Sequence, residues 1–163
     1  MNWKEILTII ISCFGVIISA IALYRSSKAS SSALNIQYAS VELAIRNAIE
    51  NSKNQIQTLS LTYAPLKVKY DNNTLSDEDN LVFEIYKKSL NSMIESMLNQ
   101  YDDACAKYID NKVDKVRFKR TYHKEISNLV ENKDFKEYFD PVTSNYKPIL
   151  LVYREWFDLE NNK

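Results

Sequence analysis

Glycine is almost absent from this chain, which has a single one, Gly15, in 163 residues. Phosphate-binding loops, tight β-hairpin turns and Rossmann crossovers depend on glycine, because their backbone takes positive φ or closely approaches a ligand. Proline is also rare, with three residues. The sequence therefore excludes glycine-dependent nucleotide-binding folds and predicts helices joined by short polar turns.

Histidine and cysteine are equally scarce, with one histidine, His123, and two cysteines, Cys13 and Cys105. One histidine and two separated cysteines cannot supply a zinc site or a cysteine–histidine pair. The two thiols are expected to lie far apart, which argues against a disulfide and fits a reducing cytosol. Since no nucleophile-elbow or P-loop motif occurs, we expect no enzymatic activity, no metal and no cofactor.

Net charge is also missing, because 21 basic residues balance 21 acidic ones. What the chain does contain is a long uncharged run, Ile6 to Leu23. As a helix, eighteen residues with a rise of about 1.5 Å each span roughly 27 Å, close to the hydrocarbon thickness of a bilayer. The sequence therefore predicts a transmembrane helix in residues 1–25, followed by a cytosolic α-helical domain in residues 26–163.

A cleaved signal peptide is the alternative for this run, because Ala20-Ile21-Ala22 fits the small-x-small cleavage pattern. The run is long for a signal peptide, and its basic region is one lysine followed by a glutamate. An uncleaved anchor is therefore favoured. Arg25 and Lys28 follow the run, which predicts a cytoplasmic C-terminal domain and a single-pass protein of the bacterial inner membrane.

Small and hydroxylated residues recur along the run at spacings of four and three and so lie within roughly ±40° of one line on a helix. We call them the small-residue stripe: Thr8, Ser12, Gly15, Ser19, Ala22 and Ser26. Three interpretations stay open. The stripe packs against copies of the same helix, lines a pore formed by such copies, or is a chance pattern.

The remaining chain reads as an all-α bundle of about four to five helices. An amphipathic pattern over residues 34–59 is followed by an expected loop at 61–75, and Ser76 and Asp114 are expected to cap helices 77–110 and 115–131. A short amphipathic piece at 134–139 and a last helix at 144–159 complete the prediction. Four charged residues of the first pattern are expected to lie in solvent: Glu42, Arg46, Glu50 and Lys53.

One segment is densely basic, with aromatic Phe118 and Tyr122 interleaved, which resembles a phosphate-binding surface on a helix. Repeated around an oligomer, it would hold an anionic oligonucleotide. The alternative is an ordinary solvated face whose charges pair with acids of helix 77–110. The candidate ligand residues are Lys112, Lys115, Arg117, Lys119, Arg120 and Lys124.

A resemblance to known proteins rests on the stretch from Tyr101 to Tyr122, on Tyr146-Lys-Pro-Ile and on Trp156, placed after an N-terminal anchor. This arrangement resembles a group of small bacterial membrane proteins, and its plan is similar to the membrane effector of the Hailong anti-phage system. The resemblance implies a tetrameric ion channel, closed by oligodeoxyadenylate that a partner nucleotidyltransferase makes. It would assign the small-residue stripe to the channel axis and the basic segment to the oligonucleotide.

Two hypotheses of different classes follow. The first is a homo-oligomeric membrane effector, an ion channel of anti-phage defence gated through its cytosolic domain. The second is a membrane-tethered helical adaptor that docks a protein partner, for which the anchor needs only to be hydrophobic.

Overall fold

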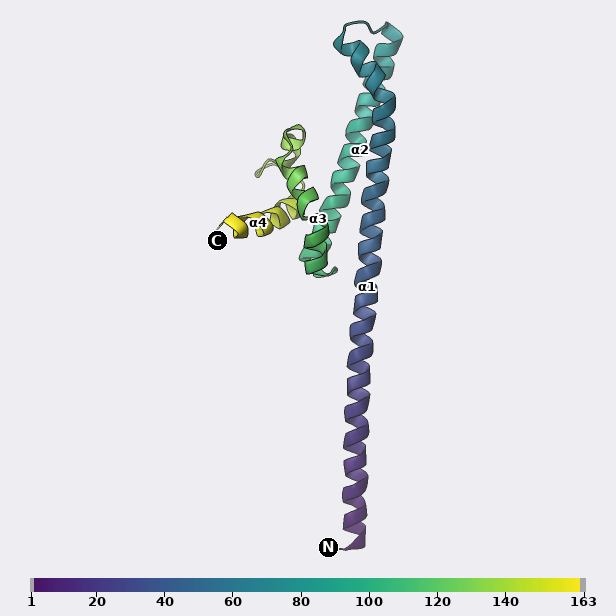
Figure 1. The fold of residues 1–163 in the computed structure, drawn as a ribbon, viewed down its shortest axis with the longest axis vertical. Helices are drawn as coiled ribbons and strands as arrows, with labels where there is room; N and C mark the ends of the chain where they lie inside the picture. The colour runs from purple at the N-terminus through teal and green to yellow at the C-terminus, as the bar shows by residue number, and fades with distance from the viewer. Residues whose placement is uncertain (1, 162–163) are drawn as a thin grey trace. The chain divides into compact units, whose positions relative to one another are not determined.

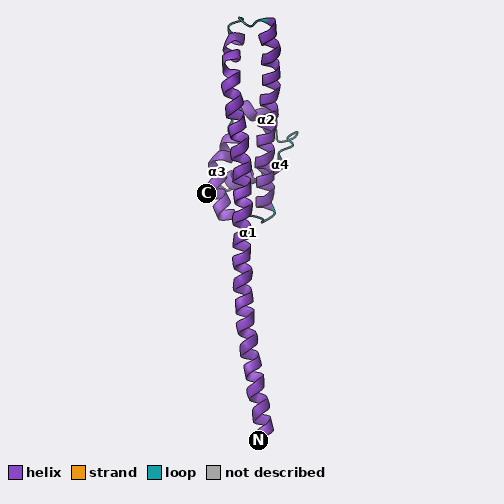
Figure 2. Ribbon diagram, turned by 90° about the vertical axis from the view of Figure 1, so that its right-hand side faces the viewer, coloured by secondary structure: helices purple, strands orange, loops and turns teal. Residues whose placement is uncertain are grey.

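The computed structural model describes residues 2–161 and, within them, the side chains of residues 2–3 and 14–157. The described part of the chain is predominantly helical and holds four α-helices and one 3-10 helix with no strand (Figure 2). This confirms the predicted all-α class. The elements are α1 (Trp3–Asp71), α2 (Asp77–Ile109), α3 (Lys115–Glu131), η1 (Lys133–Phe139) and α4 (Lys147–Asn161).

The chain divides into two compact units, Met1–Ser40 and Val41–Lys163. The first unit is the N-terminal part of α1, and almost all of its described side chains are exposed. The second unit, which we call the helical domain, contains the rest of α1 and all other elements. Across the described residues, no helical segment combines the length and the apolar character that crossing a lipid bilayer requires.

The starts of three helices follow from capping side chains that bind otherwise unpaired backbone N–H groups. Ser76 accepts a hydrogen bond from the N–H of Asp79 (3.1 Å) and begins α2. Asp114 accepts from the N–H of Arg117 (3.0 Å) and begins α3, and Asn132 accepts from the N–H of Asp134 (2.9 Å) and begins η1. The predicted caps Ser76 and Asp114 are confirmed.

The predicted loop at 61–75 is wrong, because α1 continues to Asp71 with Pro65 inside it. Tertiary packing explains the difference. Phe83 of α2 is buried between the rings of Tyr63 and Tyr70, with centroid distances of 5.1 and 4.5 Å. These two stacked contacts hold the turns on either side of Pro65 against α2 and offset the hydrogen bond that proline cannot donate.

The core of the helical domain is built around α2, which runs beside residues 41–71 of α1 while α4 packs on α2 and α3 (Figure 1). Trp156 of α4 is buried, and its indole N–H donates to the Tyr108 hydroxyl of α2 (3.1 Å). The largest fully buried side chains are Trp156, Tyr101, Phe83, Phe118, Ile49, Leu98, Ile126, Ile149, Val113, Val152 and Cys105. This core fixes the position of α3, the helix that carries most of the predicted ligand residues.

Candidate functional site

Helix α3 buries one face and leaves its basic residues on the others. Phe118, Tyr122, Ile126 and Leu129 recur at spacings of three and four and are buried. This spacing places them on one side of a helix. Since the basic residues occupy the positions between them, they flank the buried face on both sides.

Arg117 of α3 is engaged by a carboxylate of α1. Its Nε lies 2.5 Å from Oε2 of Glu42, and its Nη2 donates to Oε1 of the same residue (2.9 Å). The backbone N–H of Asp114 also donates to Glu42 (3.2 Å). The bond from Glu42 raises the pKa of Arg117, and the Glu42 side chain is only 18% exposed. Arg117 therefore joins two helices before any ligand arrives.

A second contact between α1 and α3 centres on Glu125, whose carboxylate accepts from Lys53 (2.8 Å) and from the hydroxyl of the buried Tyr101. Burial by itself raises the pKa of Glu125, but the hydrogen bonds from Lys53 and Tyr101 outweigh it, so the pKa is lowered. Burial, followed by the bond to Glu125, raises the pKa of Tyr101. Glu125 is thus held ionised at the junction of three helices.

These contacts involve the four charged residues of α1 that were expected to lie in solvent. The prediction that they lie in solvent is confirmed for Arg46, Glu50 and Lys53, which are exposed, and wrong for Glu42, which is half-buried. Three of these residues also reach α3: Glu42 binds Arg117, Lys53 binds Glu125, and Arg46 bonds the hydroxyl of Tyr122. We call this contact the charged seam: Glu42, Arg46, Glu50 and Lys53 of α1 with Arg117, Thr121 and Glu125 of α3.

A cleft of about 220 Å³ opens along the charged seam. Arg46 and Lys53 bring positive charge to this cleft and Glu50 and Glu125 bring negative charge, while the Thr121 hydroxyl already donates to the Arg117 carbonyl (2.9 Å). Its lining residues are Arg46, Ile49, Glu50, Lys53, Thr121, Tyr122 and Glu125.

Two of the predicted ligand residues lie on the other flank of α3. Lys115 and Lys119 are about 160° and 200° around the helix from Arg117. Lys115 Nζ lies 4.9 Å from the centroid of the Tyr108 ring, and Lys119 Nζ lies 5.9 Å from that of Trp156. Both are within range of a cation–π interaction, so these two lysines cover the aromatic core.

The other three basic residues are exposed. Lys112 precedes α3 and pairs with Asp110 (3.0 Å), whereas Arg120 and Lys124 form no ion pair within the described part of the chain. Arg120 and Lys124 lie on the solvent side of the charged seam. In the sequence, each comes one position before a seam residue, Thr121 and Glu125 respectively. The structure therefore brings together Arg117, Arg120 and Lys124, and separates them from Lys115 and Lys119.

The described members of the small-residue stripe are all exposed on α1. Ser19 donates its hydroxyl to the carbonyl of Gly15 within the helix (2.8 Å), and nothing lies within 4 Å of a Cβ built on Gly15. Ala22 and Ser26 are exposed as well. The side chains of Thr8 and Ser12 lie outside the described ones. The surrounding apolar side chains Phe14, Val16, Ile17, Ile18 and Ile21 are exposed too.

Sequence reasoning missed Arg46 and Lys53 as neighbours of the basic segment. One signal was available. Signs alternate along α1 at positions 42, 46, 50 and 53, and a positive and a negative residue stand eight apart on α3 at 117 and 125. The alternating charges on this face of α1 are complementary to the two opposite charges on α3. That complementarity indicates that the two faces pack against each other.

No known protein family, no curated protein and no solved structure matches this chain. Its function is therefore inferred from its own residues.

Proposed function

We propose that this chain is a homo-oligomeric membrane effector of the bacterial inner membrane. Its N-terminal helices form an ion channel of anti-phage defence, and its helical domain gates that channel on binding an anionic ligand such as oligodeoxyadenylate made by a partner nucleotidyltransferase. One observation carries the proposal: the uncharged run Ile6–Leu23 and its small-residue stripe belong to α1, which also supplies Glu42 to the basic segment.

The exposed apolar side chains between Phe14 and Leu23 support burial of this segment in another environment, because a soluble helix gains nothing from such a surface. The side chains of the run up to Cys13 lie outside the described ones. In a membrane, small residues permit close approach of neighbouring helices, and their hydroxyls bond across the contact or face a water-filled axis.

The gating step follows from Arg117. A phosphate that binds Arg117, Arg120 and Lys124 competes with Glu42 for the Arg117 guanidinium and so alters the contact between α3 and α1. Such a ligand shifts the closed–open equilibrium only by its difference in affinity for the two states.

Planar-bilayer recording of the reconstituted full-length protein tests the proposal. We expect ion conductance that changes when oligodeoxyadenylate is added, and we expect Ser19→Leu to reduce it while Ile18→Leu, on a different face, leaves it unchanged. A protein that never conducts, with or without oligonucleotide, overturns the channel proposal.

A second candidate, a membrane-tethered adaptor, is favoured by an exposed apolar face at the start of α2. Leu81, Val82 and Ile85 are 67%, 41% and 56% exposed, as expected of a docking surface. Replacing residues 1–25 with an unrelated membrane anchor distinguishes the two functions: the adaptor keeps its activity, and the channel loses it.

A further inference from the structure

Two hollows, of about 260 and 350 Å³, lie along the pair that α1 forms with α2 in the helical domain. Among the described residues, only those of α1 and α2 line them, and none from α3, η1 or α4 does. We call this surface the hairpin groove and define it by Ala44, Ala48, Thr58 and Thr62 of α1 with Met93 and Gln100 of α2.

The hairpin groove lies on the side of the pair that no other element covers. At about 100° per residue, its four α1 residues fall within an arc of about 80°, roughly opposite the α1 residues of the charged seam, which meet α3. On α2, Glu95 and Asp102 come two positions after Met93 and Gln100, about 200° around the helix. Glu95 and Asp102 face η1, and Asp102 also bonds Ile149 of α4 (3.3 Å). The elements α3, η1 and α4 therefore pack on one side of the pair and leave the groove open.

Charge is missing from the open side. The positions of α1 on this side from 44 to 62 hold alanine, asparagine, glutamine, threonine and leucine, and those of α2 from 82 to 100 hold valine, tyrosine, serine, methionine and glutamine. None is charged, although 26% of the chain is. At the two ends of the groove the charges pair within the chain, Lys107 with Asp103 and Lys69 with Asp79 (2.9 Å).

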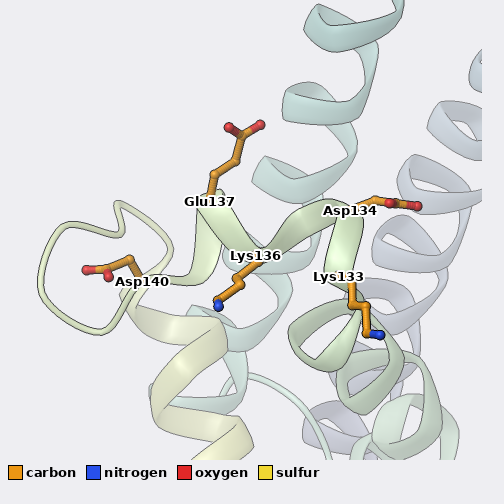
Figure 3. Close-up of a pocket in the computed structure, with 5 residues that line it drawn as sticks. All are labelled: Lys133, Asp134, Lys136, Glu137 and Asp140. Atoms are coloured by element: carbon orange, nitrogen blue, oxygen red, sulfur yellow. The ribbon is translucent and has the colours of Figure 1, made fainter.

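The covered side of the pair is charged instead. Beyond the charged seam, η1 and the residue after it carry five charged side chains at a separate hollow, and Figure 3 shows them extending in different directions: Lys133, Asp134, Lys136, Glu137 and Asp140. Ions at the surface keep such a face in water. The groove lacks this feature over most of its length.

An uncharged surface favours a second copy of the chain as its occupant. When two copies meet through the same surface, residues near the symmetry axis approach their own counterparts, so a charge there would face a like charge. The groove avoids this repulsion and offers nothing to a strongly basic or acidic partner. The small side chains of Ala44, Ala48, Thr58 and Thr62 also permit a short distance between packed helices.

The size of the groove is sufficient for a stable contact. From Val41 to Leu66 the pair is about 39 Å long and, as two helices side by side, about 20 Å wide, so a copy seated on it would cover about 800 Å² of each chain. This is the area per partner of a typical specific protein–protein interface, about 800 Å².

We propose that the hairpin groove binds the same groove of a second copy of this chain. The inference rests on the homo-oligomer of the proposed function, for which it names the contact surface of the helical domain, and it does not require ion conduction.

Thiol cross-linking of the full-length protein in detergent tests the contact. Thr62→Cys, in a Cys13→Ser background, is treated with a bismaleimide that spans about 10 Å, the separation of packed helix axes. Ala64→Cys is the matched control, because Ala64 is exposed and lies about 160° around α1 from Thr62; Cys105 is buried in both. We expect about tenfold more covalent dimer from Thr62→Cys, since a thiol held beside its copy reacts at a higher effective concentration.

A charge added to the groove should break the contact. Thr58→Glu, introduced into the Thr62→Cys variant, places like charges across the interface and should reduce the covalent dimer about tenfold. Gln57→Glu adds the same charge outside the groove and should leave the yield unchanged. Glutamate favours helix more than threonine does, so Thr58→Glu should keep the helix, which circular dichroism checks.

Three results would overturn the proposal. Ala64→Cys yields as much dimer as Thr62→Cys, which indicates random collision, or Thr58→Glu leaves the yield unchanged. In bacterial membranes, the Thr62→Cys thiol is captured by a different polypeptide and not by a second copy, which indicates a docking surface for another protein. The channel proposal fails separately: a protein that cross-links as expected but never conducts keeps this contact and loses the channel.

Discussion

The Arg117 guanidinium and the Glu42 carboxylate join α3 to α1 at two points, Nε to Oε2 at 2.5 Å and Nη2 to Oε1 at 2.9 Å. The same carboxylate accepts the N–H of Asp114, the residue that caps α3. Glu42 therefore binds both the backbone N–H of the residue that caps α3 and the first arginine of that helix. Glu42 and Arg117 lie 75 positions apart in the sequence.

Replacing this carboxylate should destabilise the helical domain. We expect Glu42→Gln to lower the free energy of unfolding, because it replaces the charge-assisted contact with Arg117 by a weaker neutral one. Urea denaturation of the full-length protein measures the change. Glu84→Gln is the control, since Glu84 and Lys87 form a looser exposed pair at 3.8 Å. Equal effects of the two variants would contradict a structural role of Glu42.

Acid should weaken the contact at Glu125. The hydrogen bonds from Lys53 and Tyr101 hold its folded-state pKa below the ordinary value of 4.5. A carboxylate with a depressed folded pKa contributes stability above its unfolded pKa, and that contribution is lost as pH falls through the folded pKa. The stability of the folded protein should therefore decrease below pH 4.5. The stability of the Glu125→Gln variant should decrease less steeply over the same pH range.

Thermal unfolding between pH 3 and pH 7 measures this dependence. Glu78→Gln is the control, because Glu78 is an exposed residue in the first turn of α2. If the pH dependence of Glu125→Gln is as steep as that of the unchanged protein, the Lys53–Glu125–Tyr101 contact is not its source.

Trp156 should be the most costly core position to truncate in α4. It is 1% exposed, packs edge-to-face on Tyr108 at 5.4 Å and donates to its hydroxyl. We expect Trp156→Ala to cost about 3–5 kcal/mol in unfolding free energy, as large cavities in cores do. Leu151→Ala, at an exposed position of the same helix, should change it by less than about 0.5 kcal/mol.

The two flanks of α3 should contribute differently to oligonucleotide binding. Arg120→Gln with Lys124→Gln removes two exposed charges beside the charged seam, whereas Lys115→Gln with Lys119→Gln removes two that lie over aromatic rings. We expect the first pair to weaken binding of oligodeoxyadenylate more and to reduce its salt slope by about 1.4, as two lost single-strand phosphate contacts would.

A filter-binding series in increasing salt measures both quantities. Lys87→Gln with Lys88→Gln on α2 is the control, with the same loss of charge away from α3. Should the Lys115 and Lys119 pair weaken binding more, the ligand lies on the flank that faces α4.

Local chemistry made much of this fold predictable. Ser76 and Asp114 determine where α2 and α3 begin because a side-chain oxygen satisfies a backbone donor a few residues away, and this relationship is visible in sequence. The buried face of α3 follows likewise from the spacing of Phe118, Tyr122 and Ile126. Both features depend on residues close together in the chain.

What could not be predicted depends on distant residues. Pro65 and the polar residues around it favour a loop locally, but Phe83 stacks between Tyr63 and Tyr70 and keeps the helix intact. Glu42 looks solvent-exposed in the sequence, but α3 supplies Arg117 and leaves the Glu42 side chain half-buried. For the same reason, the clustering of Arg117, Arg120 and Lys124 apart from Lys115 and Lys119 emerges only once the core has oriented α3.

The stacking of Phe83 on Tyr70 also has a kinetic consequence. Only thirteen positions separate the two rings, so little chain entropy is lost when they meet, whereas the Tyr108–Glu155 bond (2.6 Å) closes a separation of 47. Contacts between near neighbours form fastest in small helical proteins. We therefore expect the hairpin of α1 and α2 to assemble as the nucleus on which α4 later docks, and ring-removing changes at Phe83 to slow refolding more than those at Trp156.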